Sequence, residues 1–270
     1  MTIDLSIIGA SGKNGQEIRR LLPEFADYRV VAAIVAPDCK TNGEQYLPPG
    51  KNHGLEVHYS SAISEAVSRA QLTLDFSSPA SSVEACRCCA ERGCPIVIAT
   101  TGHSQEQLKS IQEYSAQTAV LKSANFSIGL FAALEASVAA QRVLGGSFEI
   151  EISEIHHRHK KDAPSGTALL LAEKLRESAD AKTVYGRKGL RAPGEIGLSS
   201  QRGGDVAGEH TVYFLGSGER VEVTHRVQDR SVFARGALTA GLRMIGRSPG
   251  LYALPAIVSP SNGAESCTFG

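Results

Sequence analysis

Residues 154–167 bring together the side chains of this chain that are best suited to acid–base chemistry, in the order EIHHRHKKDAPSGT. Imidazole groups titrate near neutral pH and can therefore give and take protons. Two lysines follow the histidines, and Ser165 has a side chain typical of the residue that caps a helix start. Amides at such a helix start bind anions. The stretch predicts proton transfer to or from a small substrate that carries a carboxylate.

Three interpretations of this stretch are open. It could be a solvated cationic loop, or His156, His157 and His159 could bind a metal ion. Adjacent positions at a strand end point in different directions, and no thiolate or carboxylate completes the set, so metal is not favoured. In the catalytic interpretation, a histidine and Lys160 donate protons while neighbouring cations hold a carboxylate. The outward-facing amides expected to suit an oxyanion are those of Ser165, Gly166 and Thr167.

A second motif lies near the amino terminus, where glycine recurs at Gly9, Gly12 and Gly15. These glycines stand between an apolar segment, residues 3–8, and a helical pattern. Glycine there lets the backbone turn tightly and approach a pyrophosphate, which the helix start then stabilises. Any tight strand-to-helix turn can use glycine, but the first junction of an alternating chain favours a dinucleotide coenzyme. Lys13 is either a phosphate contact or a solvated loop lysine.

The residues after the second expected strand usually distinguish the two nicotinamide coenzymes. An acidic side chain there holds the ribose hydroxyls of NAD, and a basic one accommodates the extra phosphate of NADP. This chain has Val35-Ala36-Pro37, which supplies neither charge, although Asp38 and Lys40 follow. The sequence leaves the choice between NADH and NADPH open and predicts no strong preference.

Strand-like and helix-like segments alternate through the first half of the chain. Strands are expected at residues 3–8, 28–35, 72–76, 96–99 and 118–122, and helices at 14–22, 82–92 and from a Ser104 cap onward. Such alternation implies right-handed crossovers and a parallel sheet covered on both faces. Thr100-Thr101-Gly102 and residues 123–127 follow strands at the edge where ligands bind in such sheets, although both could be ordinary turns.

The pattern changes after about residue 128. The elements expected are a helix at 128–144, a strand at 148–155, a helix from Ser165 to about 178, a hairpin at 210–215 and 219–227, and a helix at 231–245. The residues 182–208 are expected to form a long functional or interface-forming loop. The predicted fold class is α/β: a nucleotide-binding domain with a parallel sheet, followed by an α+β domain. The last helix is expected to return to the first domain.

The composition argues against some functions. Lys plus Arg and Asp plus Glu number 28 each among 270 residues, so the net charge is zero. A general binder of nucleic acid or of anionic membranes usually carries a basic excess. No apolar run is expected to approach the roughly 20 residues of a membrane span, and the first residues lack the pattern of a signal peptide. A cytoplasmic protein is expected.

Four of the six cysteines cluster at positions 86, 88, 89 and 94. On a helix, Cys86 and Cys89 share a face while Cys88 points elsewhere, and no histidine is near in sequence. A metal site is therefore not favoured. We expect reduced thiols that pack as small hydrophobic side chains.

The stretch from His156 to Ala168 (HHRHKKDAPSGTA) closely resembles the signature of the 4-hydroxy-tetrahydrodipicolinate reductase family, also called dihydrodipicolinate reductases. Similar stretches are the amino-terminal glycine loop and residues 100–102, 125–129 and 202–211, so the resemblance spans nearly the whole chain. The family implies a Rossmann-like dinucleotide-binding domain, here residues 1–127 and 230–270. It implies a domain for substrate binding and tetramerisation, here residues 128–229, a homotetramer, and a role in diaminopimelate and lysine biosynthesis.

The resemblance also implies roles for single residues. His156 is the proton donor or acceptor and Lys160 a second proton donor. The substrate is held by His157, Gly166 and Thr167, with carboxylate contacts from Lys160 and Ser165. The lining of the coenzyme is Gly9, Ala10, Ser11, Gly12, Lys13, Asn14, Ala99, Thr100, Thr101, Ser123, Ala124, Asn125 and Phe126. The implied reaction transfers hydride from NADH or NADPH to a cyclic unsaturated dicarboxylate, with protonation by His156 or Lys160 and without a metal.

The departures from the family pattern lie on the coenzyme side. Ala99 stands where the family often has glycine, Lys13-Asn14 where Arg-Met is usual, and Val35-Ala36 where an acidic–basic pair is usual. The substrate signature is intact. Two alternatives follow: a reductase of a related cyclic imine dicarboxylate in secondary metabolism, and a nucleotide-binding homologue without catalysis.

Overall fold

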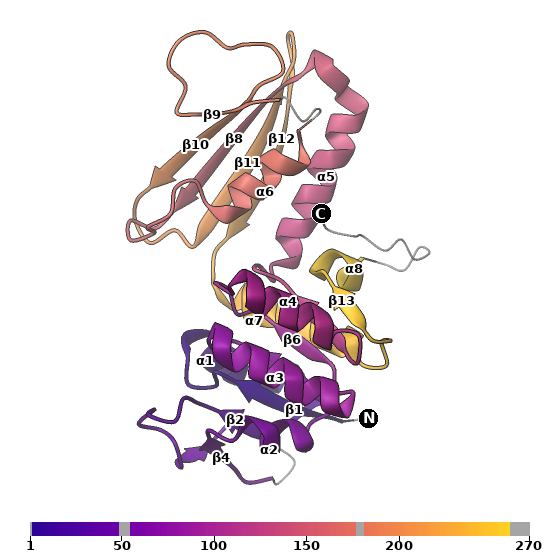
Figure 1. The fold of residues 1–270 in the computed structure, drawn as a ribbon. Helices are drawn as coiled ribbons and strands as arrows, with labels where there is room; N and C mark the ends of the chain where they lie inside the picture. The colour runs from indigo at the N-terminus through magenta and orange to yellow at the C-terminus, as the bar shows by residue number, and fades with distance from the viewer. Residues whose placement is uncertain (1, 49–54, 177–180, 260–270) are drawn as a thin grey trace. The chain divides into compact units, whose positions relative to one another are not determined.

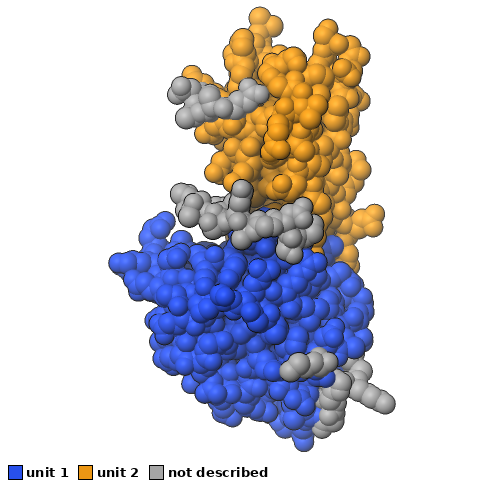
Figure 2. All heavy atoms as spheres, turned by 90° about the vertical axis from the view of Figure 1, so that its right-hand side faces the viewer, with its two compact units in different colours: residues 1–126, 231–270 blue, residues 127–230 orange. Residues whose placement is uncertain are grey.

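The computed structural model describes residues 2–48, 55–176 and 181–259. The chain forms two compact units, residues 1–126 with 231–270 and residues 127–230 (Figure 2). Each unit is built on a β-sheet of its own. The chain therefore leaves the first unit once and returns to it.

The first unit holds the parallel sheet that the alternating pattern predicts. In the described residues its eight strands follow the order β13-β7-β6-β5-β1-β2-β4-β3, and only β3 and β4 pair antiparallel. The strands are β1 Ile3–Ile8, β2 Tyr28–Ile34, β3 Gln45–Tyr46, β4 Val57–Ser60, β5 Leu72–Asp75, β6 Ile96–Ile98, β7 Ala119–Lys122 and β13 Gly250–Tyr252. Because β1, β5, β6 and β7 are neighbours and parallel, the loops that follow them gather at one edge of the sheet.

Helices pack against this sheet (Figure 1). They are α1 Lys13–Leu21, α2 Ile63–Ser68, α3 Pro79–Arg92, α4 Gln105–Tyr114, α7 Ser231–Met244 and α8 Leu254–Val258, with a 3₁₀ turn at Leu22–Glu24. α7 comes from the far end of the chain and packs on α1, β5 and β6. Tyr28 Oη donates to Leu238 O at 2.7 Å, and Gly236 lies so close to Phe126 O that a Cβ would overlap it. Small residues therefore let α7 approach the sheet closely.

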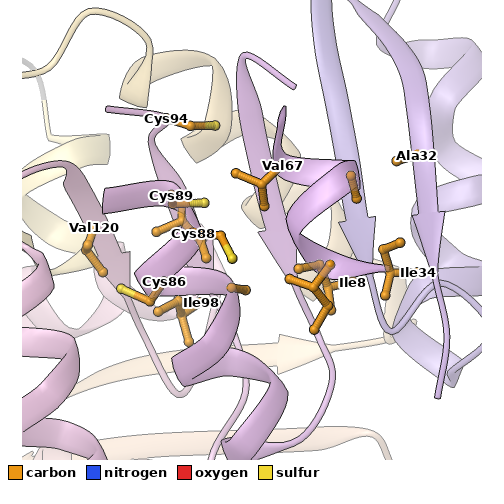
Figure 3. Close-up of a cluster of buried hydrophobic side chains, with 14 of the residues drawn as sticks. Ile8, Ala32, Ile34, Val67, Cys86, Cys88, Cys89, Cys94, Ile98 and Val120 are labelled. Carbon is orange, nitrogen blue, oxygen red and sulfur yellow. The ribbon is translucent and has the colours of Figure 1, made fainter. Parts of the chain in front are cut away.

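Four cysteines belong to the core between the sheet and α2, α3 and α4 (Figure 3). Cys86, Cys88, Cys89 and Cys94 are at most 6% exposed and pack with side chains that include Ile98. Burial raises the pKa of Cys86 to about 12, so its thiol is neutral. The described cysteines are free thiols, and the prediction of reduced, core-packing cysteines is confirmed for these four. Cys267 lies outside the described residues.

The second unit is a mixed five-stranded sheet with helices on one face. Its order is β12-β11-β8-β10-β9 in the described residues; β10 runs parallel to β8 and β9, and β11 runs antiparallel to β8 and β12. The elements are α5 Ile128–Leu144, a 3₁₀ turn Gly145–Ser147, β8 Glu149–His156, α6 Gly166–Lys174, β9 Thr183–Tyr185, β10 Ile196–Arg202, β11 Gly208–Leu215 and β12 Arg220–Val227. Leu134 of α5 and Leu171 of α6 share a buried cluster with Ile152.

Several elements differ from the sequence prediction. The segment 182–208, predicted to be a loop, contains β9 and β10. Only Ile196 and Leu198 of β10 are apolar and buried, and the polar remainder hides the strand pattern. The short strands β3, β4 and β13 were likewise not predicted. α6 ends at Lys174 instead of about 178, and residues 177–180 lie outside the described part. The capping box at Ser104, the Ser165 cap and the hairpin of β11 and β12 are confirmed.

α5 has the length and composition of a possible membrane span. With the turn that follows, residues 128–147 have a mean hydropathy of 1.3, and it is the one such helix in the described ranges. The sequence prediction that no apolar run approaches this length is corrected here, because residues 128–147 meet the criteria in spite of Glu135 and Arg142. Leu130 and Leu134 are buried in the second unit. Of the apolar stretch as a whole, however, only 17% is buried. A single helix of this kind is weak evidence for a span, because helices of globular proteins meet the same criteria.

Candidate active site

The candidate catalytic residue His156 is the last residue of β8. Alternate side chains of this strand are buried on the face that α5 and α6 cover: Ile150, Ile152, Glu154 and His156. In a strand, residues two apart point to the same side of the sheet. The alternation of β8 therefore carries a carboxylate and an imidazole into the edge of an apolar core.

The Glu154 carboxylate is fully buried and accepts hydrogen bonds on both oxygens. Oε2 accepts from His156 Nδ1. Oε1 accepts from the Ser165 amide at 3.2 Å and from Arg202 Nη2 at 2.7 Å. Burial alone would raise the pKa of Glu154, but hydrogen bonds from Arg202, Ser200 and His156 outweigh it and hold the pKa below its usual value. Glu154 is therefore an ionised carboxylate at neutral pH.

His156 presents its other ring nitrogen, Nε2, to Gly208 at the start of β11. A Cβ at Gly208 would lie 3.0 Å from Nε2, so glycine leaves the space that the ring occupies. Burial lowers the pKa of His156; Glu154 opposes this effect, while Lys160 and Arg202 add to it. A lowered pKa makes the protonated imidazole a stronger acid.

His210 lies beside His156 and directly opposite Glu154 in the register of β8 and β11. The two imidazole rings meet edge to face, with centroids 5.1 Å apart. Burial lowers the pKa of His210 to about 4, so it is neutral near pH 7 and does not repel a protonated His156. Its Nε2 lies 3.1 Å from Ser165 Oγ, and its Nδ1 has no partner among the described residues.

Lys160 lies in the turn after β8, where its amide donates to His157 O at 3.1 Å. Its ammonium contacts both carboxylate oxygens of Asp162 at 2.8 Å. The two side chains are 21% and 60% exposed, and ion pairs at this exposure contribute little stability. The ammonium can therefore exchange Asp162 for the carboxylate of a substrate.

The start of α6 differs in one respect from the sequence prediction. Ser165 is its N-cap, and Oγ accepts from the Ala168 amide at 3.2 Å. The prediction that the Ser165 amide faces outward is wrong, because this amide donates to the buried Glu154. Ser165 is itself 2% exposed. Gly166 is exposed and Thr167 partly exposed, so the open part of the helix start lies at these two residues.

Glu154, His156 and His210 are also the one group in the described ranges whose possible metal-donor atoms lie within 4.8 Å of one another. This group differs from the one that the sequence offers, in which His157 and His159 are the partners of His156. Both Glu154 oxygens already accept hydrogen bonds, and the guanidinium of Arg202 opposes a cation there. The arrangement fits a hydrogen-bonded acid–base site better than a metal site.

In the first unit, the glycine loop joins β1 to α1 at the carboxyl edge of the sheet. Gly9 has a φ of +82°, and a Cβ there would overlap the Phe76 carbonyl oxygen. A Cβ at Gly15 would overlap the carbonyl oxygens of Gly9 and Ala10. Within the described loop, no side chain caps α1 at Gly12, and the first turn has no acidic residue. The free amides at this helix start therefore fit the pyrophosphate of a dinucleotide.

The other residues expected to line the coenzyme in this loop differ in exposure. Ala10 is buried, and its amide donates to Ile34 O at 2.9 Å. Gly12 and Lys13 are exposed, and Ser11 and Asn14 are partly exposed. The exposed members are the ones that a coenzyme can reach.

A second fully buried carboxylate, Asp75, ends β5 beside the glycine loop. Its Oδ2 accepts from Thr100 Oγ1 at 2.6 Å, and its Oδ1 accepts from the amide and the hydroxyl of Ser77. Burial raises the pKa of Asp75, and these hydrogen bonds only partly offset it. The Thr100 hydroxyl therefore donates its hydrogen bond to Asp75. Its neighbours are more open, since Ala99 is partly exposed and Thr101 is exposed.

The segment after β7 forms a tight turn. Ser123 Oγ donates to Asn125 O at 2.6 Å, and Ala124 is exposed. The Phe126 ring is 2% exposed and lies with its centroid 6.4 Å from that of Phe76. Phe126 therefore belongs to the core of the first unit, and Ala124 is the open part of this turn.

The loop after β2 contacts the glycine loop. Cys39 Sγ lies 3.5 Å from Ser11 Oγ and 3.2 Å from Thr41 Oγ1, and these hydrogen bonds lower the pKa of the Cys39 thiol. Val35 is buried, and Ala36, Asp38 and Lys40 are exposed. No charged side chain occupies the first exposed position after β2 in this described loop.

Sequence reasoning gave no role to Glu154, Arg202, His210 or Asp75. Glu154 could have been found, since it is in phase with the buried Ile150 and Ile152 of an alternating strand. Asp75 likewise follows three buried residues in β5. A carboxylate in a buried phase requires partners. His156 and Ser77 lie two residues along the chain from these carboxylates. No local signal identifies Ser165, Arg202 and Thr100, which come from other elements.

A glycine loop at the carboxyl edge of a parallel sheet, in a chain with a separate α+β unit, is typical of oxidoreductases that use a pyridine nucleotide. Two family models match the chain: "Dihydrodipicolinate reductase, N-terminus" over residues 3–126 and "Dihydrodipicolinate reductase, C-terminus" over residues 128–258. The chain therefore belongs to the dihydrodipicolinate reductase family, as the signature at 156–168 indicates.

Individual relatives agree with this assignment. The 4-hydroxy-tetrahydrodipicolinate reductase of Aquifex aeolicus is 39% identical over 259 residues, which cover 94% of this chain and 98% of that protein. The reductase of Myxococcus xanthus is 38% identical over 254 residues, covering 91% and 94%. Among solved structures, a dipicolinate-bound dihydrodipicolinate reductase from Paenisporosarcina sp. TG-14 has a TM-score of 0.75 at 23% identity and covers 94% of this chain and 98% of that one. The predicted fold class is confirmed.

Proposed function

We propose that this protein reduces 4-hydroxy-tetrahydrodipicolinate to tetrahydrodipicolinate with NADH or NADPH, in diaminopimelate and lysine biosynthesis. The observation that supports the proposal is the Glu154 carboxylate, which His156 shares with the amide of the α6 cap Ser165, in a chain of the reductase family. Proton donors next to an anion-binding helix start suit a dicarboxylate that must gain a proton.

His156 and Lys160 are the proposed proton donors. The imidazole is held on one side by Glu154 and offers Nε2 to the substrate. The ammonium of Lys160 is cationic and pairs with Asp162 until a substrate carboxylate replaces it. A positioned proton donor typically accelerates a reaction by about 10²–10⁴-fold.

The substrate carboxylates are proposed to contact His157, Gly166 and Thr167. Gly166 and Thr167 stand at the open part of the α6 start, where backbone amides favour an anion. Ser165, for which a carboxylate contact was expected, is buried and bonded to Glu154 and His210. We therefore assign Ser165 to the support of the site.

The coenzyme is proposed to lie along residues 9–14, 99–101 and 123–126. When bound, the nicotinamide supplies the hydride. The glycine loop leaves room for the pyrophosphate because side chains at Gly9 or Gly15 would not fit. Thr100 and Phe126 are only 5% and 2% exposed as whole residues, so they are proposed to support the coenzyme site more than to contact the coenzyme. The methyl group of Ala99 narrows the site relative to the glycine usual in the family.

We also propose a cytoplasmic homotetramer. Apolar side chains on the second unit are left uncovered in one chain: Tyr185 is 56% and Leu190 100% exposed. Contacts between chains commonly bury such surface. Light scattering coupled to size exclusion tests the tetramer, and a monomeric mass at micromolar concentration would contradict it.

The test of the reaction is a coupled assay that generates the lysine-pathway substrate and follows oxidation of NADH and NADPH separately. Turnover with this substrate supports the proposal. Turnover only with another cyclic imine dicarboxylate would instead indicate a reductase of secondary metabolism. Coenzyme binding without turnover on any dicarboxylate would indicate the non-catalytic homologue.

A further inference from the structure

Glu154 connects three parts of the candidate active site. We infer that Glu154 is a positioning residue for the reduction: it holds the hydrogen of His156 on Nδ1, so that Nε2 alone exchanges a proton with the substrate, and it ties this imidazole to the start of α6. The inference rests on the proposed role of His156 as a proton carrier and goes beyond it by naming the side chain that makes the imidazole suitable.

The hydrogen bonds of Glu154 support this role. One oxygen accepts from His156 Nδ1, and the other accepts from the Ser165 amide at 3.2 Å and from Arg202 Nη2 at 2.7 Å. An ionised carboxylate can only accept, so the shared hydrogen must reside on Nδ1. The Nε2 atom then carries a lone pair in the neutral ring and a hydrogen in the cation. A carboxylate that fixes a histidine tautomer in this way serves the same purpose in Ser-His-Asp sites.

The burial of the three bonded residues supports it as well. Glu154 is 0% and Ser165 2% exposed, and His156 is 9% exposed. A buried carboxylate without partners would be strongly unfavourable, and here its partners are the proton carrier and the first residues of the anion-binding helix. One side chain therefore sets the orientation of the imidazole and the position of Gly166 and Thr167.

The charges around His156 show what Glu154 contributes. The titratable groups that act on the imidazole are Glu154, Lys160 and Arg202, with neutral His210 edge-on to the ring. Glu154 is the anion of this set, and the two other charged groups are cations. Without it, a protonated His156 would face two positive charges in a buried place.

The decisive variant is Glu154→Gln, with Glu151→Gln as its matched control. Glu151 lies on the same strand and is also bonded to arginines, Arg187 and Arg191, but it takes no part in the proposed machinery. We expect Glu154→Gln to lower kcat by about 10–100-fold with a small change in KM, and Glu151→Gln to leave both unchanged. The pH above which kcat falls should move down by about one unit or more, because the imidazolium loses its anion.

Glu154→Asp keeps the charge. We expect its pH profile to return toward that of the unaltered protein even where kcat stays reduced, which a purely structural role for Glu154 would not produce. A Glu154→Gln protein that is folded, turns over within about twofold of the unaltered rate and keeps its pH profile would overturn the inference.

Nitrogen-15 NMR of the imidazoles in the unaltered protein tests the tautomer directly and does not depend on the folding of any variant. We expect His156, assigned with His156→Ala, to carry its hydrogen on Nδ1; a neutral ring with the hydrogen on Nε2 would refute the inference. If the unaltered protein shows no turnover with any dicarboxylate, the proposed function fails, while the tautomer still decides whether Glu154 positions His156.

Discussion

In the part of the chain that the structure describes, each unit has one fully buried carboxylate near the end of a strand, Asp75 on β5 and Glu154 on β8. The two differ in the charge of their hydrogen-bond partners. Asp75 accepts from the neutral Ser77 and Thr100, and burial raises its pKa. Glu154 accepts from His156 and Arg202, whose hydrogen bonds outweigh burial and lower its pKa. A fully buried carboxylate is therefore bonded to neutral hydroxyl and amide donors of the loops in one unit, and to an imidazole and a guanidinium in the other.

The difference matches what each site is proposed to bind. A coenzyme pyrophosphate is held by backbone amides, which must be placed by well-ordered loops. An imidazolium that delivers a proton gains from a fixed anion behind it. The hydrogen-bond partners of the buried carboxylate, more than its position in the fold, therefore distinguish the Asp75 site from the Glu154 site.

The largest effect should come from removing the groups that only the charged site has. His156→Ala and Lys160→Ala should each lower kcat by about 10²–10⁴-fold, because each removes a proton donor. Steady-state assays measure this, with circular dichroism to confirm folding. Thr100→Val, which removes a hydrogen bond to Asp75, is the comparison variant and should affect turnover less. Near-normal rates for both of the first variants would rule out the assigned roles.

Two glycines offer a second test, since each leaves room at one of the two sites. Ala at Gly208 would press on His156 Nε2, and Ala at Gly15 would overlap the carbonyls of the glycine loop. We expect Gly208→Ala to lower kcat about tenfold with unchanged coenzyme binding, and Gly15→Ala to weaken coenzyme binding about tenfold or more. Fluorescence titration and steady-state kinetics separate the two. Equal effects of both variants on coenzyme affinity would contradict the assignment of Gly208 to the His156 site and of Gly15 to the coenzyme site.

The two carboxylates should also give opposite pH dependences of stability. Asp75 has a raised folded pKa, so its contribution is present below about pH 4 and is lost as pH rises through the folded value. Glu154 has a lowered folded pKa, so its contribution is present above about pH 4 and is lost as pH falls. Relative to the unaltered protein, Asp75→Asn should gain Tm with rising pH, and Glu154→Gln should gain with falling pH. Differential scanning calorimetry should resolve shifts of about 2–4 °C for each kcal/mol; shifts of the same sign would break the comparison.

The smallest effect is expected for coenzyme choice. Ala36 is exposed and uncharged after a buried Val35, so neither the ribose hydroxyls nor an extra phosphate meets a dedicated side chain there. The ratio of kcat/KM for NADH and NADPH should stay below about a hundredfold, or roughly 2.7 kcal/mol. Parallel assays with the two coenzymes measure it, and a larger ratio would indicate that a charged side chain near this edge, Asp38, Lys40 or Lys13, discriminates.

Much of the fold could be predicted because its signals are local. The parallel strands of the first unit, the capping box at Ser104, the Ser165 cap and the hairpin of β11 and β12 all rest on periodicity or on neighbours within a few residues. β10 could not be predicted, because its polar half has no alternation and its stability comes from lying between β8 and β9. The Ser165 amide was placed wrongly for a related reason: its acceptor is eleven residues away on another element.

By itself, the sequence determined the alternating sheet, the glycine loop and the signature that carries His156 and Lys160, because residue type, period and short spacing encode each of them. Only the tertiary structure decided which groups surround His156. Arg202 reaches Glu154 across 48 residues of chain and Ser165 meets His210 across 45, and these meetings depend on the pairing and register of β8, β10 and β11. Strand register arises from packing of the whole unit, so no local sequence pattern could predict it.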